Sequence, residues 1–150
     1  MDIILIAAIT IDGYIARQSD EVISWSKDLK LFKKQTMGYP VIMGSNTEKT
    51  LAVGLDGREQ IVVHRNDKPD KIIGELNAEK CFIIGGGRTY AKFAPFLTHL
   101  YITPHPIVFG KGIRLFSDLK EELSLKFIRK ITVNKTDGIF QFQYKVIRQL

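Results

Sequence analysis

The chain has only one cysteine, Cys81, among its 150 residues, and this excludes an internal disulfide. A lone cysteine is typical of proteins in a reducing compartment, so we expect a cytoplasmic protein. No apolar run approaches the ~20 residues that a membrane span needs, and we expect no membrane partner. The apolar run at residues 3–9 lacks a basic leader and a cleavage-like site, so we expect no signal peptide. The residues around Cys81 do not suggest a metal cluster, and we expect no metal.

Dense basic blocks and interleaved aromatic stripes are also absent. The formal net charge is +6, with 22 lysines and arginines against 16 acidic residues. These cations are spread along the chain, which is not the pattern of a nucleic-acid-binding surface. A positive field of this kind also attracts polyanionic small molecules. We therefore expect no nucleic-acid partner, and a nucleic-acid-binding module stands as an alternative from another class.

The chain shows no linker, internal repeat or low-complexity tract, which predicts a single domain over residues 1–150. The continuous apolar run at 3–9 is typical of a strand that is covered on both faces of a parallel sheet. Alternating segments at 125–133 and 140–146, joined by Asp137-Gly138, predict a C-terminal antiparallel hairpin. The expected fold class is α/β, with a mostly parallel central sheet, this hairpin and helices on both faces.

The segment Trp25–Thr47 combines a helix, a strand and a second helix start. We expect Trp25, Leu29 and Phe32 on one side of a helix, with lysines on the other side. Asp28 then projects into the apolar side, where loss of water raises the pKa of a carboxyl group. Asp28 is therefore a candidate proton-handling group. The alternative is an aspartate in the first helical turn that only complements the helix dipole.

Two strand–glycine–helix corners predict an anion site. The first is the strand Pro40–Met43 with Gly44 after it, followed by a capping-box pattern at Ser45 and Glu48. In the second, Cys81–Ile84 precedes three glycines, Gly85–Gly87, and a helix over about 88–96. Glycines allow close backbone approach, and free N–H groups at a helix start attract anions, so the two corners can hold a pyrophosphate. The dinucleotide fingerprint G-x-G-x-x-G is missing, which excludes a Rossmann assignment.

Several shorter segments allow two interpretations. The pair His64-Arg65 follows the predicted strand Gln60–Val63, where it suits a ligand phosphate or belongs to a solvated loop. The Leu55–Arg58 segment is by itself a surface turn with an exposed arginine. We expect Lys71–Ile73 to form a short strand. We interpret His105, which lies between two prolines, as structural, and Thr103 as a strand threonine.

Residues Asp28–Thr36, Pro40–Gly44 and Thr47, together with Ile84–Tyr90, resemble the dihydrofolate reductase family. The resemblance is ungapped to about His64 and covers most of the chain. It implies hydride transfer from NADPH to 7,8-dihydrofolate, giving tetrahydrofolate for one-carbon metabolism, by a monomer or homodimer. It also implies that Asp28 is the catalytic residue, which binds the pterin and favours protonation at N5.

The resemblance also assigns binding residues. It places substrate contacts at Ile6, Ala8, Phe32, Leu51, Leu55, Arg58 and Thr103. It places cofactor contacts at Ala8, Ile15, Gly44, Ser45, Asn46, Thr47, His64, Arg65, Ile84, Gly85, Gly86, Gly87, Arg88, Thr89 and Tyr90. Arg58 matches the arginine that grips the α-carboxylate of the glutamate tail, although Asp56 replaces the family's proline. The polar loop Tyr14–Ser24 is the expected lid over the nicotinamide.

Three features depart from the family pattern. Trp25 lies two residues beyond the usual tryptophan position, which Ile23 occupies. The Gly110–Phe116 tract is more typical of riboflavin-pathway pyrimidine reductases, which share the fold and act on a 5-amino-6-ribosylamino-uracil phosphate. Ser45 and Asn46 stand where many members have basic residues, which leaves NADPH and NADH both open. A pyrimidine reductase and a reductase of another pteridine are therefore the rival enzymes.

Overall fold

A seven-stranded sheet organises the computed structural model, which describes residues 1–51 and 54–148. The strand order is β4-β3-β5-β1-β6-β9-β8. The strands are β1 (Asp2–Thr10), β3 (Val41–Gly44), β4 (Gln60–Val63), β5 (Lys80–Gly85), β6 (His99–His105), β8 (Ser124–Asn134) and β9 (Ile139–Ile147). All pairs from β4 to β6 are parallel, whereas β9 runs antiparallel to both β6 and β8. The predicted fold class is confirmed.

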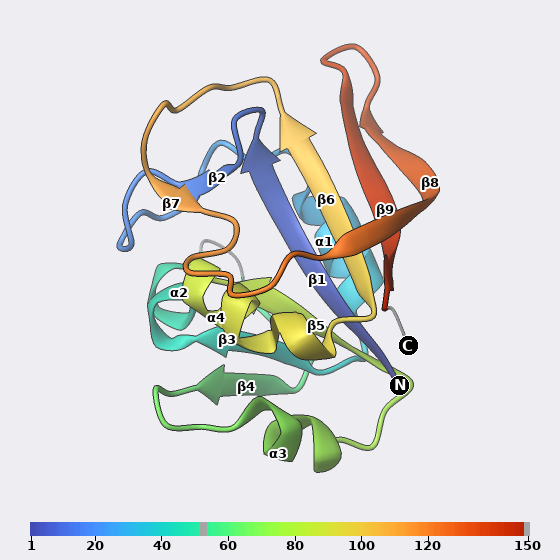
Figure 1. The fold of residues 1–150 in the computed structure, drawn as a ribbon. Coiled ribbons are helices and arrows are strands. Elements are labelled where there is room, and N and C mark those ends of the chain that lie inside the picture. Colours follow the sequence, from blue (N-terminus) through green and yellow to red (C-terminus); the bar gives the residue numbers. More distant parts are fainter. Residues whose placement is uncertain (52–53, 149–150) are drawn as a thin grey trace.

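The apolar strand β1 lies at the centre of the sheet, between β5 and β6 (Figure 1). Successive side chains of a strand point to opposite faces. Ile3, Leu5 and Ala7 accordingly enter one hydrophobic cluster, and Ile4 and Ile6 enter the other. Burial on both faces explains why this segment shows a continuous apolar run without polar alternation.

Helices cover both faces of the sheet (Figure 1). Helix α1 (Leu29–Thr36) lies behind the sheet in this view, and α4 (Gly87–Phe93) lies in front of it. Three shorter elements are α2 (Ser45–Thr50), α3 (Pro69–Gly74) and the 3-10 turn η1 (Ala94–Phe96). Within the described residues, no helix has both the length and the apolar character needed to cross a membrane.

Three local predictions were wrong. Helix α1 begins at Leu29, so Asp28 is its N-cap and Trp25 lies before the helix. Gly44, rather than Ser45, caps α2 and no side-chain cap bond forms, so the predicted capping box is absent. Residues 71–73 belong to α3, not to a strand. A proline at the first helical position favours this short helix, which connects β4 to β5.

A small second sheet anchors the segment that was expected to form the lid. Strands β2 (Tyr14–Ala16) and β7 (Ile113–Arg114) pair antiparallel. Beside this pair, a Cβ atom on Gly112 would collide with the Ala16 carbonyl oxygen, and Gly112 has φ 144°. Gly112 is therefore required because the backbone of Ala16 approaches it closely beside these paired strands.

The predicted C-terminal hairpin is confirmed, with Asp137-Gly138 in the turn between β8 and β9. Strand β9 also contacts helix α1 through paired amides. The Gln35 and Gln141 side chains exchange two hydrogen bonds of 2.7 and 2.9 Å, and Gln143 donates to Gln141 at 3.0 Å. Because Gln141 and Gln143 are buried, these bonds satisfy groups that water does not reach.

Candidate functional site

A cavity of about 980 Å³ lies along the carboxyl ends of the parallel strands. Ligands of open α/β sheets bind at this edge. The walls come from β1, from the β3–α2 and β5–α4 corners, from the end of β4 and from the start of α1. Most of the sequence-predicted site residues line it, and these are Ile6, Ala8, Ile15, Asp28, Phe32, Gly44, Ser45, Asn46, Thr47, Leu51, His64, Arg65, Ile84, Gly85, Gly86, Gly87, Arg88, Thr89 and Tyr90.

Asp28 is the buried carboxylate of this cavity. It is 7% exposed, and as the N-cap of α1 its side chain makes no capping bond within the part of the chain that the structure describes. Burial raises the pKa of the Asp28 carboxyl group, outweighing the opposite effects of His105 and Thr103. The prediction of a desolvated carboxylate with a raised pKa is therefore confirmed, although the residue sits one position before the helix.

Thr103 belongs to β6 and is not among the residues that line the cavity. Its side chain is fully buried, and its hydroxyl oxygen has no hydrogen-bond partner among the described residues. Interaction with this hydroxyl nevertheless lowers the pKa of Asp28, so the two groups face each other. A second hydrogen-bonding group thus stands behind the carboxylate.

The two glycine corners touch each other. A Cβ atom on Gly44 would lie 2.8 Å from the Thr89 hydroxyl oxygen, and one on Gly85 would lie 3.0 Å from the Thr47 hydroxyl oxygen. On Gly87 it would collide with Ser117 and the Arg114 carbonyl oxygen at 2.5 and 2.6 Å. On Gly86 the nearest described atom would be the Thr47 hydroxyl oxygen at 3.7 Å, which is an ordinary contact. Close packing therefore explains Gly44, Gly85 and Gly87. Gly86, in contrast, leaves open space at the cavity wall.

Basic groups line the cavity near the end of β4. They comprise Arg65 from that strand end and Arg88 and Lys92 from α4, together with the imidazole of His64. The Lys92 ammonium also donates to the carbonyl oxygens of His64 and Arg65, at 3.0 and 3.1 Å, and so holds this strand end. Sequence reasoning missed Lys92, although it lies four positions after Arg88 on the same helix face, where side chains are neighbours.

Arg58 is buried and does not line the cavity, so the surface-turn alternative was wrong. Its guanidinium donates to the Asp56 carbonyl at 3.2 Å, the Thr36 hydroxyl at 3.2 Å and the Gly54 carbonyl at 3.0 Å. Arginine has five N–H donors. Two are thus not engaged by the described residues, and the guanidinium lies 6.0 Å from the ring centre of Phe32, which lines the cavity.

Leu55 is also buried and outside the cavity, within the cluster of Ile4 and Phe82. Several cavity residues had not been assigned individually as substrate or cofactor contacts. Besides Lys92 they include Gln18, Ser19, Glu21, Ile23, Ser26, Leu29, Thr50, Val63, Ile113 and Ser117. Those from 18 to 26 lie in the irregular segment before α1, where no periodic pattern indicates which side chains point inward.

Comparison with known proteins identifies the family. The family model described as "Dihydrofolate reductase" matches residues 2–105. The chain is 36% identical over 117 residues to dihydrofolate reductase type 3 of Salmonella typhimurium, covering 69% of this chain and 71% of that protein. It is 28% identical to dihydrofolate reductase type 9 of Escherichia coli, over 91% and 89% of the two chains.

Solved structures share the fold at low sequence identity. One is dihydrofolate reductase from Enterococcus faecalis complexed with NADP(H) and RAB-propyl, with TM-score 0.77, 18% identity and coverage of 98% and 97%. Another is a putative riboflavin biosynthesis protein from Shewanella, with TM-score 0.69, 23% identity and coverage of 99% and 100%. The model match over more than half of the chain and the 36% identity with the Salmonella protein show that this chain belongs to the dihydrofolate reductase family of oxidoreductases.

Proposed function

We propose that the chain reduces 7,8-dihydrofolate to tetrahydrofolate with NADPH. The observation that carries this proposal is the buried Asp28, whose pKa is raised by burial, in a cavity that also contains an open glycine corner and a basic end. Both relatives described above are named dihydrofolate reductases. The protein would act in one-carbon metabolism in the cytoplasm, as a single domain over residues 1–150 in a monomer or homodimer.

The cavity fits a dinucleotide that carries an additional phosphate. Backbone at Gly86 leaves the room that a pyrophosphate needs, while Arg65, Arg88 and Lys92 supply positive charge near the end of β4. This charge compensates for Ser45 and Asn46 and favours NADPH over NADH. When bound, NADPH supplies the hydride, and the protein binds and orients the reactants.

Asp28 would recognise the pterin. An ionised carboxylate accepts hydrogen bonds from the amino and ring N–H groups, and its charge favours protonation at N5. Thr103 behind it would complete the recognition. Phe32 and Leu51 line the cavity where the aminobenzoyl group would lie, with Leu55 packed behind them. The two N–H groups of Arg58 that no described residue engages would donate to the α-carboxylate of the glutamate tail.

A pyrimidine reductase of the riboflavin pathway is the second candidate. It is favoured by the Gly110–Phe116 tract and by Trp25, whose ring packs against Phe109, with centroids 5.5 Å apart. The similar Shewanella fold supports it at the level of architecture. In that enzyme Arg58 and Lys33 would face a phosphate instead of a glutamate.

The deciding experiment measures NADPH oxidation in the presence of dihydrofolate. Turnover with dihydrofolate, inhibited competitively by methotrexate, is the expected result. NADPH binding without methotrexate binding would favour the pyrimidine reductase or a reductase of another pteridine. Binding of neither would favour a nucleic-acid-binding module that keeps the fold.

Replacing Arg58 by leucine should raise the KM for dihydrofolate by about 10- to 100-fold, the equivalent of a charge-assisted pair worth ~1.5–3 kcal/mol. The KM for NADPH should stay nearly constant. Steady-state kinetics would test this, with Arg58→Lys as the matched variant because it keeps the charge and loses the planar fork. A pterin without the glutamate should bind all three proteins alike. An equal loss of affinity for that shortened ligand would show that Arg58 serves only the fold.

A further inference from the structure

His105 ends strand β6 immediately beside the segment that carries Asp28, and the proposed chemistry does not use it. Its side chain is 1% exposed. The backbone N–H of Lys27 donates to its Nε2 atom over 2.9 Å, and its Nδ1 atom lies 2.8 Å from the Thr103 carbonyl oxygen. One imidazole thus connects the residue before Asp28 to the backbone of the strand that carries Thr103.

These partners define the protonation state of the ring. A carbonyl oxygen can only accept, so Nδ1 carries the proton; a backbone N–H can only donate, so Nε2 is bare. His105 is therefore a neutral imidazole in this arrangement. Protonation of Nε2 would oppose the Lys27 N–H and break that bond. Among the described residues, Arg17 and Glu21 form the only ion pair, so no ion pair joins Asp28 to His105.

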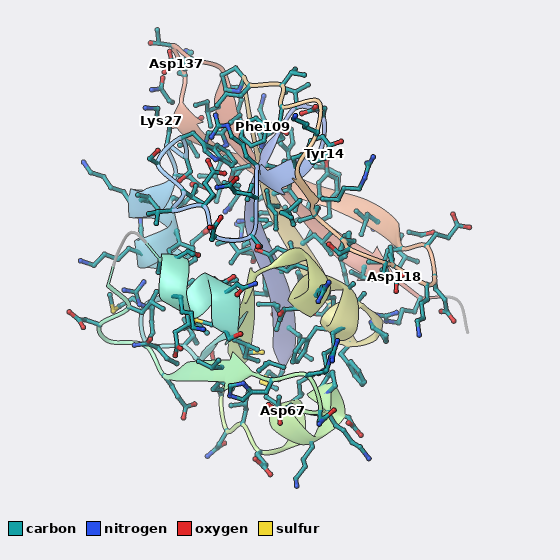
Figure 2. The ribbon with its side chains drawn as sticks, turned by 90° about the vertical axis from the view of Figure 1, so that its left-hand side faces the viewer. Tyr14, Lys27, Asp67, Phe109, Asp118 and Asp137 are labelled. Atoms are coloured by element: carbon teal, nitrogen blue, oxygen red, sulfur yellow. The ribbon has the colours of Figure 1, made fainter. Side chains whose placement is uncertain are left out.

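Besides its two hydrogen-bond partners, the imidazole of His105 is contacted by an aromatic side chain. The Trp25 ring meets His105 edge-on, with centroids 5.3 Å apart, and meets Phe109 in the same way at 5.5 Å. The Arg17 guanidinium lies 4.3 Å from the centre of the Phe109 ring. Lys27 and Phe109 are labelled at the same end of the molecule in Figure 2, far from Asp67. The imidazole therefore has little freedom to leave its two backbone partners.

We propose that His105 is a positioning residue for Asp28: as a neutral imidazole it fixes the Lys27 backbone against β6 and thereby fixes the carboxylate in the cavity wall. It contacts neither substrate nor cofactor. This role depends on the proposed function of Asp28. The same role explains the displaced position of Trp25, because its indole packs edge-on against the imidazole of His105.

Two amide variants separate the two bonds of His105. Asparagine places an N–H near the position of Nδ1 and has no acceptor for Lys27, whereas glutamine reaches the position of Nε2 with a carbonyl oxygen. His105→Asn should lower kcat with dihydrofolate by about 10- to 100-fold, the scale of a small misplacement of a catalytic group. His105→Gln should recover most of that loss. Equal losses in both variants, or no loss in the asparagine variant, would overturn the proposal.

The pKa of Asp28 provides a second measurement that needs no substrate. It can be followed by the 13C shift of the carboxyl carbon in the ligand-free protein. His105→Asn should shift the pKa of Asp28 away from its wild-type value, whereas His105→Gln, which keeps an acceptor for the Lys27 N–H, should leave it nearly unchanged. If His105 acted instead through a positive charge, both neutral amides would raise the pKa of Asp28 alike, and that result would overturn the proposal. The pKa measurement tests the role of His105 even if the wild-type protein does not reduce dihydrofolate. That failure would reject only the proposed function.

A measurement on the wild-type protein covers the case in which the asparagine variant does not fold. Nitrogen-15 shifts of the ring at neutral pH should show a proton on Nδ1 and a bare Nε2. An imidazolium, or the opposite tautomer, would contradict the role of His105 because Lys27 N–H would then have no acceptor there.

Discussion

Replacing Asp28 by asparagine should lower turnover with dihydrofolate at neutral pH by at least ~10²-fold, the usual scale for a positioned acid–base group. Asparagine keeps the shape but loses the charge and the acceptor-only oxygens. The loss should shrink as the pH is lowered, because substrate protonated in solution no longer needs the carboxylate. Steady-state rates from acid to neutral pH test this. An aspartate that serves only the helix dipole, worth about 0.3–1 kcal/mol, would leave the pH–rate profile unchanged.

The same substitution should affect stability with a defined sign. Burial raises the pKa of Asp28 in the folded protein, so its ionised form opposes folding. The contribution of Asp28 to stability is full below its ordinary pKa of 3.8 and is lost as the pH rises through the raised pKa. The asparagine variant should therefore melt at a higher temperature than wild type at pH ~7, with the gap closing in acid. Melting curves over this range check it, and a lower melting temperature at neutral pH would contradict it.

Replacing Gly86 by valine should abolish NADPH binding at concentrations that saturate the wild-type protein. Among the described residues, a Cβ atom at this position would meet Thr47 alone, at 3.7 Å, so the empty protein accepts it. The added side chain would occupy the space that we assign to the pyrophosphate. Overpacking costs about 1–3 kcal/mol, which corresponds to a ~5- to 150-fold loss of affinity, and the loss is larger where the pyrophosphate no longer fits at all. Isothermal titration measures the loss, and circular dichroism shows whether the variant is folded.

Gly87→Ala is the matched control for the neighbouring position. Its Cβ atom would collide with Ser117 and with the Arg114 carbonyl oxygen, at 2.5 and 2.6 Å. This variant should lower the melting temperature, whereas Gly86→Val should not. Unchanged NADPH affinity in a folded Gly86→Val protein would remove this glycine from the proposed site.

Local patterns were sufficient wherever the structure depends on neighbours in the chain. The apolar run of β1 and the alternation of β8 and β9 predicted those strands because successive side chains of a strand point to opposite faces. The pattern did not predict which face is buried: most of β8 is exposed, and the buried positions of β9 include Gln141 and Gln143. Three residues at 71–73 are too few to separate a strand from a helix by period. Ile72 and Ile73 pack against the core from α3, which either structure would allow.

Long-range contacts account for the remaining errors in the candidate site. In the sequence pattern, Trp25 continues the apolar side of a helix. In the structure its ring packs on His105 and Phe109, which come from a distant part of the chain. The burial of Arg58 depends on acceptors at Thr36 and Gly54. No pattern around Leu55–Arg58 or around His105 reports those partners, so the sequence alone leaves Arg58 on a surface turn and His105 without a role.

The central place of β1 has a consequence for biosynthesis. The strand is synthesised before both of its neighbours, and the Ile3 N–H finds its acceptor on Thr98, 95 residues later. Until β5 and β6 have left the ribosome, the apolar side chains of β1 have no native partner, and such exposed strands are prone to aggregate. Nascent chains that end before residue 105 should therefore depend on chaperones, and the sheet should form only after β6 has been released.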